Sequence, residues 1–318
     1  MKVLITGGAG YIGSVTSAYL LDHGYDVNIL DNLSEGNESL VDTRANFIFG
    51  SILDEISIHQ AMQECQAVVH LAGKAIVSES MQNSHEYLLN NHTGTKKILQ
   101  AMVNHSIKKI VFSSTCAVYG NPKVTTIAED CIANPINPYG KSKLLADLEI
   151  AKFTSTHEFQ SISLRFFNVA GSYESQGHKL FGELHKNETH LIPRLLMQNT
   201  IDVYGSDMDT PDGTCVRDYV HVTDLARAIK LSLEKIKTPG HRIYNLGSGG
   251  GSSVKEVIEI AETILGKKIS RNNVNKRIGD PAYLVSNPDL AKNELGWEAR
   301  YSLTQIINDS KRFIMSRG

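Results

Sequence analysis

The chain has 318 residues, of which 32 are basic and 34 are acidic, and its formal net charge of −2 with no long basic run indicates no nucleic-acid partner. No apolar stretch approaches the roughly 18–20 residues of a membrane span, and glycines interrupt the amino-terminal apolar run too early for a signal peptide. No membrane partner is therefore expected. The four cysteines are scattered without CxxC spacing, which predicts a reducing, cytoplasmic environment. His185 and His190 lie five residues apart and no HExxH motif occurs, so the sequence predicts no metal site.

Short β-branched runs alternate with helical patterns through the first half of the chain. Strands are expected at residues 2–6, 25–30, 45–50, 67–72, 108–114 and 161–167. Helices are expected at residues 12–23, 56–65 and 86–104, and from Tyr139 onward. Because apolar strands that alternate with helices form parallel sheets covered on both faces, the pattern predicts an α/β fold with a doubly wound, Rossmann-type parallel sheet.

The alternation loosens after Phe167, and the polar, glycine-containing segment 168–190 predicts an irregular lobe that serves a ligand. Further helices are expected at residues 191–198, 223–235, 254–265, 288–294 and 303–317. We expect one domain of residues 1–170 plus about 218–246, and a smaller mixed α/β lobe of residues 171–217 plus about 247–318, with a cleft between them.

The first predicted strand and helix are joined by a glycine-rich turn. Gly7, Gly10 and Gly13 have GxxGxxG rather than GxGxxG spacing, and glycines here permit a tight turn and a close backbone approach to a pyrophosphate at the helix N-terminus. Asp31 ends the second predicted strand, where a carboxylate accepts hydrogen bonds from a ribose 2′-hydroxyl and repels a 2′-phosphate. This turn predicts dinucleotide binding and favours NAD over NADP.

A second motif lies at the expected carboxyl edge of the sheet. The strand that ends in Ser113 and Thr115 is followed by a helix on which Tyr139 and Lys143 share one face, because residues i and i+4 are neighbours. The alternative is that Tyr139 and Lys143 form an ordinary solvated pair. A tyrosine with a pKa of about 10 is a poor base, but a nearby ammonium group and a nicotinamide cation both favour the phenolate.

The TGGAGYIG turn, the Thr115 strand and the Y-x-x-x-K spacing of Tyr139 and Lys143 resemble the extended short-chain dehydrogenase/reductase family. Within it, the chain is similar to the 4-epimerases of UDP-sugars through stretches that cover nearly its whole length in order, among them ILDNLS, FSSTCAVYG, NPYGKSKL, LRFFNVAG, DGTCVRDYVHVTDLA and RIGDPA. The resemblance implies that the larger domain binds NAD, that the smaller lobe binds a nucleotide sugar and that the protein is a homodimer.

The activity that this resemblance implies is the interconversion of UDP-glucose and UDP-galactose through oxidation at the sugar C4, rotation of the 4-keto intermediate and its reduction on the other face. Tyr139 would be the base for the 4-hydroxyl group, Thr115 would share its hydrogen bonding, and Lys143 would hold the ribose and lower the pKa of Tyr139.

The resemblance also implies two sets of binding residues. Those expected to bind the cofactor are Gly7, Gly10, Tyr11, Ile12, Gly13, Asp31, Asn32, Ser51, Ile52, Leu71, Ala72, Gly73, Asn90, Ser113, Tyr139, Lys143 and Phe167. Those expected to bind the substrate are Thr115, Tyr139, Asn168, His190, Leu191, Tyr204, Arg217, Tyr219, Arg277, Asp280 and Leu284. Arg217 and Arg277 would clamp the diphosphate, since guanidinium forks suit phosphate oxygens; the alternative is a pair of surface salt bridges. Tyr204 would pack near the uracil.

Several positions depart from the family pattern. Ser51 stands where an aspartate often binds the adenine, and Lys74 precedes by one residue the lysine that many members have at the position of Ala75. His190 replaces a frequent asparagine. Leu284 occupies the position that bounds the sugar pocket, which is a tyrosine or a smaller residue in different members.

Three other functions stay open on this sequence. A nucleotide-sugar dehydratase commonly needs an Asp–Glu pair after the catalytic threonine, whereas Thr115 is followed by Cys116 and Ala117. A 4-epimerase of UDP-N-acetylglucosamine or UDP-arabinose differs only in the size and shape of its pocket. A dinucleotide sensor without activity would keep the fold, but the intact Thr115, Tyr139 and Lys143 favour an enzyme.

Overall fold

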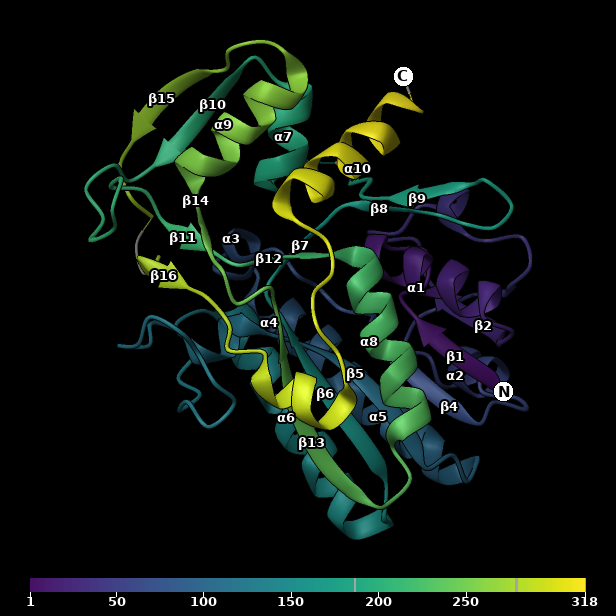
Figure 1. Cartoon of the computed structure of the whole chain (residues 1–318). Coiled ribbons are helices and arrows are strands. Elements are labelled where there is room, and N and C mark those ends of the chain that lie inside the picture. The colour runs from purple at the N-terminus through teal and green to yellow at the C-terminus, as the bar shows by residue number, and fades with distance from the viewer. Residues whose placement is uncertain (186, 278–279, 318) are drawn as a thin grey trace.

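The computed structural model describes residues 1–185, 187–277 and 280–317. At its centre lies a seven-stranded sheet in the order β13-β6-β5-β4-β1-β2-β3, in which every neighbouring pair is parallel (Figure 1). Its strands are β1 (Lys2–Thr6), β2 (Asp26–Asp31), β3 (Asn46–Phe49), β4 (Ala67–His70), β5 (Lys109–Thr115), β6 (Gln160–Phe166) and β13 (Gly240–Leu246). The chain progresses outward from β1 in one direction and from β4 in the other. The expected doubly wound parallel sheet is therefore confirmed.

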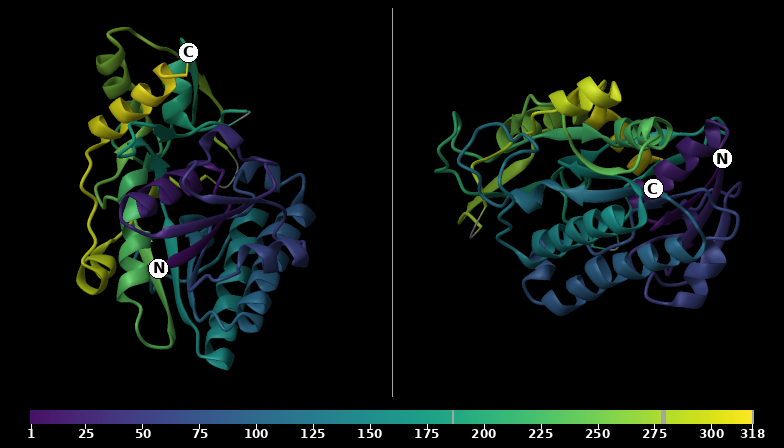
Figure 2. Two further views of the ribbon diagram at one scale, coloured as in Figure 1. Left: turned by 90° about the vertical axis from the view of Figure 1, so that its right-hand side faces the viewer. Right: turned by 90° about the horizontal axis from the view of Figure 1, so that it is seen from below.

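Helices cover both faces of this sheet. Those next to it are α1 (Tyr11–Asp22), α2 (Glu55–Ala61), α5 (Gly94–Asn104), α6 (Pro138–His157) and α8 (Val222–Lys235). Alternate residues of β1 point to opposite faces, so Val3 packs in one core with α1 and α8, whereas Leu4 packs in the other with α2, α5 and α6. Figure 2 shows the sheet between the two helical layers in its right-hand view.

The helix predicted over residues 86–104 is interrupted in the structure. A short α4 (Ser84–Tyr87) continues into the π-helical segment η2 (Leu88–Thr93) and then into α5. Asn91 lies in this wider turn, where its amide nitrogen donates to the Lys74 carbonyl oxygen (2.9 Å) and to Ser142 Oγ (2.9 Å). The π-helical turn thus joins the segment after β4 to α6, a use of such turns that is frequent near functional sites.

The remaining elements form a smaller mixed α/β lobe at the top of Figure 1. Its helices are α7 (Leu191–Met197), α9 (Val254–Leu265) and α10 (Leu303–Met315), and they pack against β10 (Thr200–Tyr204), which pairs in parallel with β15 (Ser270–Val274). A second small sheet has the order β14 (Ser252–Ser253), β11 (Val216–Arg217), β16 (Tyr283–Leu284).

Two further strand pairs and one short helix connect the lobe to the sheet. The pairs are β7 (Asn168–Ala170) with β12 (Tyr219–His221), and β8 (Ser172–Glu174) with β9 (Leu180–Gly182). The π-helical segment η4 (Ala291–Leu295) falls in a range that we expected to belong to the lobe, yet its Ala291 and Leu295, with Trp297, are buried in the same core as α8. The carboxyl-terminal part of the chain therefore packs on both parts of the molecule.

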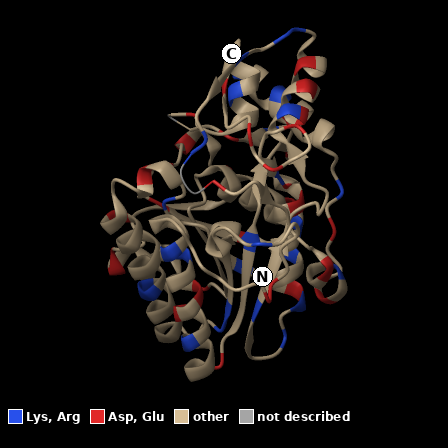
Figure 3. Ribbon diagram, turned by 90° about the vertical axis from the view of Figure 1, so that its left-hand side faces the viewer, with Lys and Arg blue, Asp and Glu red and all other residues tan. Residues whose placement is uncertain are grey.

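Charged side chains are spread over the whole molecule. Acidic and basic residues are interspersed along the ribbon (Figure 3). Among the helices of the described ranges, none combines the length and the apolar character that a bilayer crossing requires.

Candidate active site

The glycine turn between β1 and α1 is closed by steric contacts that only glycine permits. Gly7 has a φ of +73°, and a Cβ atom there would lie 2.7 Å from the backbone nitrogen of Ala72, in the segment after β4. A Cβ atom at Gly13 would lie 2.0 Å from the Gly7 carbonyl oxygen. At Gly10 it would meet only that same oxygen, at 3.4 Å, so the face of Gly10 is open. The turn therefore leaves the space through which a pyrophosphate approaches the backbone.

The start of α1 offers backbone donors to an anion. Its N-cap residue is Gly10, and no side chain caps the first turn, so the first N–H groups of the helix are available. The Tyr11 hydroxyl group donates to the Gly171 carbonyl oxygen (2.7 Å), and Ile12 packs in the core. The backbone N–H groups of these two residues can therefore face a dinucleotide, while the hydrogen of the Tyr11 hydroxyl group is used within the protein.

Asp31, the last residue of β2, links that strand to the glycine turn. Its carboxylate accepts from the Ala9 N–H (3.0 Å) and from the Leu33 N–H (2.8 Å), and burial raises its pKa. This position at the strand end suits a carboxylate that accepts from a ribose.

The other expected cofactor residues lie around the same edge. Ile52 is buried and Leu71, Ala72 and Gly73 directly follow β4. Ser51 Oγ accepts from the Leu53 N–H (3.1 Å), so part of its hydrogen-bonding capacity is already used. The exposed side chain of Asn32 binds Ser34 (2.8 Å).

Asn90 and Lys74 are bound mainly to neighbouring protein groups. The Asn90 amide donates to the Glu86 carbonyl oxygen (3.0 Å). Lys74 Nζ lies 3.0 Å from a carboxylate oxygen of Glu35, 3.6 Å from Glu79 and 3.2 Å from Glu86. Three carboxylates thus hold this ammonium group. Lys74 is therefore engaged with the protein itself, unlike the lysine that many family members have at the position of Ala75.

The start of α6 places Tyr139 beside Thr115. Asn137 caps the helix by accepting from the Gly140 N–H (2.8 Å), with Pro138 as its first residue. A Cβ atom at Gly140 would lie 2.5 Å from the Ala117 carbonyl oxygen, so this glycine lets the helix start pack directly on the turn after β5. The Thr115 hydroxyl group consequently interacts with the Tyr139 phenol.

Lys143 is buried one helical turn further on. Its Nζ donates to the Ser113 carbonyl oxygen (2.9 Å) and to Ser113 Oγ (3.3 Å), and it lies 4.8 Å from the centroid of the Phe112 ring. Burial lowers the pKa of Lys143 to about 8, although Asp147 opposes this effect. The solvated-pair interpretation therefore does not fit Lys143.

The phenol of Tyr139 is not prepared as a base by the protein alone. Burial raises the pKa of Tyr139 to about 12, and the interaction with Thr115 lowers it by less. We expected Lys143 to lower this pKa, but in this structure burial is the larger effect, and the Lys143 ammonium group is engaged with Ser113.

Asp147 extends the same helix face and was not identified from the sequence. Its carboxylate accepts from Ser114 Oγ (2.8 Å) and lies 3.5 Å from Arg165 Nη2. Tyr139, Lys143 and Asp147 are spaced i, i+4 and i+8, so all three lie along the side of α6 that faces β5. An acidic residue four positions after the lysine was the only available signal, and on its own it also fits an ordinary helix surface.

Asn168 and Tyr219, both expected to bind the substrate, are brought together by strand pairing. They are register partners in the parallel pair of β7 and β12, and their side chains interact. Burial raises the pKa of Tyr219 to about 12. Fifty residues of sequence separate the two positions, so the pairing itself could not be read from the sequence.

Arg217 and Leu284 are also register partners, in the pair of β11 and β16. Arg217 Nη1 donates to the Val216 carbonyl oxygen (2.8 Å), and Nη2 forms an ion pair with Asp280. Asp280 thus orients this guanidinium group in the structure. The two side chains are 13% and 26% exposed, so Arg217 forms a salt bridge, as the alternative has it, at a partly buried position.

Arg277 stacks on Tyr204, with its guanidinium carbon 3.9 Å from the ring centroid. Tyr204 ends β10, and Arg277 lies shortly after β15, the partner of β10. Ile278 and Gly279 of the RIGDPA stretch lie outside the described residues. The second member of the expected diphosphate clamp is therefore positioned by an aromatic ring rather than by an ion pair.

Leu284 lies close to the carboxyl end of β5, which carries Thr115. It packs in a cluster with Val118, Tyr119, Ile127 and Phe167, which also includes Cys116, the residue after Thr115. The residue expected to bound the sugar pocket and the strand end that carries Thr115 thus share one apolar cluster.

His190 and Leu191 mark the start of α7, where His190 is the N-cap residue. His190 Nδ1 pairs with Glu183, so Nε2 is the one ring nitrogen left for another partner. Burial lowers the pKa of His190, but the carboxylates of Glu183 and Glu188 outweigh this effect and raise it to about 10.

Asp218 is a second buried carboxylate that the sequence did not single out. It is fully buried and accepts five hydrogen bonds, from the backbone N–H groups of Ser248, Gly249 and Ser286 and from two serine hydroxyl groups. Three separate segments therefore meet at Asp218, directly between Arg217 and Tyr219.

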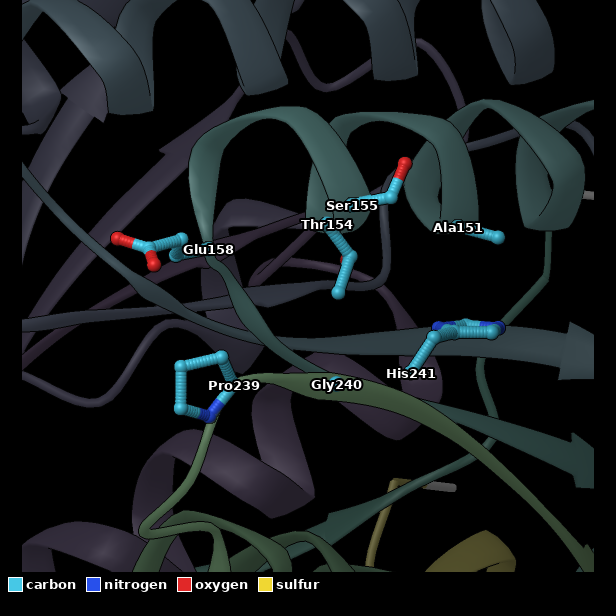
Figure 4. Close-up of a pocket in the computed structure, with 7 residues that line it drawn as sticks. All are labelled: Ala151, Thr154, Ser155, Glu158, Pro239, Gly240 and His241. Carbon is cyan, nitrogen blue, oxygen red and sulfur yellow. The ribbon is translucent and has the colours of Figure 1, made fainter.

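A surface hollow lies at the opposite end of the sheet domain. Figure 4 shows its lining residues, Ala151, Thr154, Ser155, Glu158, Pro239, Gly240 and His241. Thr154 is 15 residues after Tyr139 on α6, which corresponds to about 22 Å along a helix. The hollow is therefore separate from the carboxyl edge on which the expected site residues lie.

The fold and this edge together define the class. A doubly wound sheet with a glycine turn at α1 and a Thr–Tyr–Lys group after β5 is that of an NAD-binding enzyme of the extended short-chain dehydrogenase/reductase type. The model of the NAD dependent epimerase/dehydratase family matches residues 3–247. The chain belongs to this family, and the resemblance inferred from the sequence is confirmed.

Individual proteins that are similar to this chain include UDP-glucose 4-epimerases. The chain is 42% identical over 324 residues to the UDP-glucose 4-epimerase of Corynebacterium glutamicum, which covers 100% of this chain and 97% of that protein. The crystal structure of the UDP-glucose 4-epimerase from Brucella ovis in complex with NAD has a TM-score of 0.93 and 39% identity, with 98% of each chain covered. That of the Bifidobacterium longum enzyme in complex with NAD+ and UDP has a TM-score of 0.93 and 34% identity, with 99% of this chain and 98% of that chain covered. The expected NAD cofactor is thereby confirmed.

Proposed function

We propose that the protein interconverts UDP-glucose and UDP-galactose by NAD-dependent oxidation and reduction at the sugar C4. The observation that carries this proposal is the position of Tyr139 beside Thr115, with Lys143 buried against Ser113, at the edge that also holds the glycine turn. The full-length similarity to UDP-glucose 4-epimerases supports the choice of substrate.

Tyr139 acts as base and acid in this proposal. Its phenolate oxygen takes the proton of the 4-hydroxyl group during oxidation and returns it during reduction, while the Thr115 hydroxyl group hydrogen-bonds the same sugar oxygen. NAD, when bound, accepts the hydride from C4 and gives it back, and its oxidised ring adds the positive charge that favours the Tyr139 phenolate.

Lys143 supplies a positive charge and hydrogen-bond donors at the same site. Its ammonium group is bound to Ser113 near the carboxyl end of β5. Lys143 also lies on the same helix, α6, as Tyr139. We assign it to the nicotinamide ribose, where it offers donors to hydroxyl oxygens.

The nucleotide is held by the smaller lobe. Arg217 and Arg277 bind the diphosphate through their guanidinium donors, and Asp280 and Tyr204 hold these two arginines in place. The lobe fixes the diphosphate, so the 4-keto sugar beyond it can rotate and present its other face. Asn168, His190, Leu191 and Tyr219 complete the nucleotide contacts, and Leu284 bounds the sugar pocket.

Assembly and compartment complete the proposal. Leu89 on η2 and Leu148 on α6 are exposed apolar residues on two elements that contact each other, which fits a homodimer that buries this face. The four cysteines are free thiols, as expected in the cytoplasm. Light scattering of the wild type and of Leu148→Glu tests the dimer, which the charged variant is expected to weaken.

The experiment that tests the activity is an incubation of the purified protein with UDP-galactose and no added cofactor. We expect UDP-glucose to form, because NAD is reduced and reoxidised in each turnover and is not consumed. A 4-keto-6-deoxy sugar would instead indicate a dehydratase. Bound NAD without any conversion of UDP-galactose, UDP-N-acetylglucosamine or UDP-arabinose would indicate a sensor.

A further inference from the structure

Four potential metal ligands come together between β9 and α7. Glu183 directly follows β9, His190 caps α7, and His185 and Glu188 lie between them. One ligand atom from each of the four residues lies within 4.8 Å of all the others. The sequence spacing alone did not predict this cluster, because it arises only when the segment folds back on itself.

Two of the spacings between these atoms are close to those of ligands in a small coordination sphere. Glu183 Oε1 lies 3.2 Å from His185 Nε2, and Glu188 Oε1 lies 3.5 Å from His190 Nδ1. Ligands at about 2.0–2.1 Å from a tetrahedral zinc ion are separated by about 3.3 Å. Glu183 Oε1 also pairs with His190 Nδ1.

The ligands are presented by fixed elements. A Cβ atom at Gly182 would lie 2.5 Å from the Phe313 ring, so β9 packs tightly on α10 just before Glu183. Glu188 Oε1 accepts from the His190 N–H (2.7 Å), which orients this carboxylate. The side chain of Glu183 is only 6% exposed and has two histidines as its partners. Binding of a metal ion here would displace the proton that His190 shares with this carboxylate, because an imidazole coordinates a metal only in its neutral form.

The chemistry of the four ligand atoms indicates which kind of cation they can bind. Two imidazole nitrogens and two carboxylates suit zinc and other divalent transition metals, whereas Mg²⁺ and Ca²⁺ prefer six or more oxygen ligands. We propose that Glu183, His185, Glu188 and His190 form a binding site for one divalent transition-metal ion of the zinc class, which closes the segment before α7. Four protein ligands make a closed set, so the site is structural rather than catalytic.

The test measures zinc binding to the full-length protein after treatment with a chelator, in competition with a chromophoric indicator. We expect one Zn²⁺ per chain, and affinity losses in His185→Gln and Glu188→Gln of at least the 10- to 100-fold that even loss of a supporting hydrogen bond costs. His178→Gln is the matched control. His178 forms an exposed pair with Glu174 (2.9 Å) in the neighbouring hairpin and belongs to no larger cluster of ligands among the described residues, so this variant is expected to bind zinc like the wild type.

A second measurement follows the hydrogen exchange of the backbone amides. Hydrogen exchange of residues 183–185 and 187–190 is expected to slow on addition of Zn²⁺ in the wild type and in His178→Gln, but not in His185→Gln. Absence of zinc binding in the wild type would overturn the proposal and leave the histidines as the partners of the carboxylates. Equal zinc affinity in the wild type and in His185→Gln would also overturn it, since the ion would then be bound elsewhere, for example at the free thiols.

Discussion

The carboxyl edge of the sheet and the smaller lobe hold their functional side chains in different ways. At the sheet edge, Thr115 and Lys143 lie on a seven-residue strand and a 20-residue helix, and both are buried. In the lobe, Arg217 lies on a strand of two residues, and Arg277 lies outside any strand. Their positions depend on an ion pair with Asp280 and on stacking against Tyr204.

This difference matches the two tasks of the proposed mechanism. Proton transfer needs atoms fixed to within a few tenths of an ångström, which regular elements provide. A sugar that rotates between two half-reactions needs a firmly held diphosphate and few contacts of its own. Side chains on short strands and loops can close around a nucleotide and release it, because such segments open at a lower free-energy cost than core elements.

The largest expected effect is at the sheet edge. Tyr139→Phe removes the acid–base group and should lower epimerisation by about 10²- to 10⁴-fold, while the fold and bound NAD persist. Tyr87→Phe is the control, because the Tyr87 ring lies 6.3 Å from that of Tyr139 but its hydroxyl group binds the Ile76 carbonyl oxygen instead. Turnover of Tyr139→Phe near the wild-type rate would remove Tyr139 from the mechanism.

Asp218→Ala tests how strongly the segments that meet at Asp218 depend on this carboxylate. This change leaves the backbone donors of Ser248, Gly249 and Ser286, of which only the last is fully buried, without their charged acceptor, and hydrogen bonds to charged groups contribute about 1.5–3 kcal/mol each. We expect the free energy of unfolding to fall by about 3 kcal/mol or more. Denaturation by urea measures this, with Ser248→Ala as the milder comparison. A loss below about 1 kcal/mol would show that the junction does not depend on Asp218.

The lobe is tested by Arg217→Ala and Arg277→Ala. Each should weaken UDP binding by about 1.5–3 kcal/mol, the contribution of hydrogen bonds to a charged group. Lys276→Ala is the control, because Lys276 is exposed and lies at 4.0 Å from Asp207. Unchanged UDP affinity in both arginine variants, measured by calorimetry, would mean that these side chains serve the structure of the lobe alone.

The buried Lys143 is expected to make the free energy of unfolding depend on pH. Lys143 has a pKa of about 8 in the folded protein and near 10.5 when unfolded, so between these values the unfolded chain binds one proton more and stability rises with pH. Stripped of dinucleotide, the wild type should gain about 2 kcal/mol relative to Lys143→Met between pH 7.5 and 9.5. Urea midpoints of both proteins at the two pH values measure this. A parallel response of the two proteins would contradict the burial of a charged Lys143.

The smallest expected effect concerns the sugar pocket. Leu284→Tyr adds a ring beside the cluster that contains Phe167 and Cys116, and should reduce turnover of UDP-N-acetylglucosamine relative to UDP-glucose. One apolar group changes such discrimination by about 1–3 kcal/mol, and we expect the lower end because leucine already fills part of this space. The ratio of kcat/KM for the two substrates is the measurement. A constant ratio would place position 284 outside the pocket.

Local patterns determined much of this protein from its sequence. The strand–helix alternation, the glycines at the start of α1, Asp31 at the end of β2, and the spacing of Tyr139 and Lys143 are all relations between residues close in the chain. Their physical basis is local as well: the periods of strand and helix, the turn that glycine permits and the i, i+4 face of a helix. These features predicted the doubly wound sheet and the NAD site.

Tertiary structure decided the relations between distant segments. The pairing of Arg217 with Leu284, the convergence of three segments on Asp218, and the contact of Asp147 with Ser114 each join residues far apart in the sequence. A buried carboxylate has no sequence signature of its own, since the same residue type is usual on a solvated surface. The cluster around Glu183 is short in sequence, yet it too depends on how β9 and α7 are anchored. Which polar residues become buried partners is fixed by packing, because only packing removes the competing water.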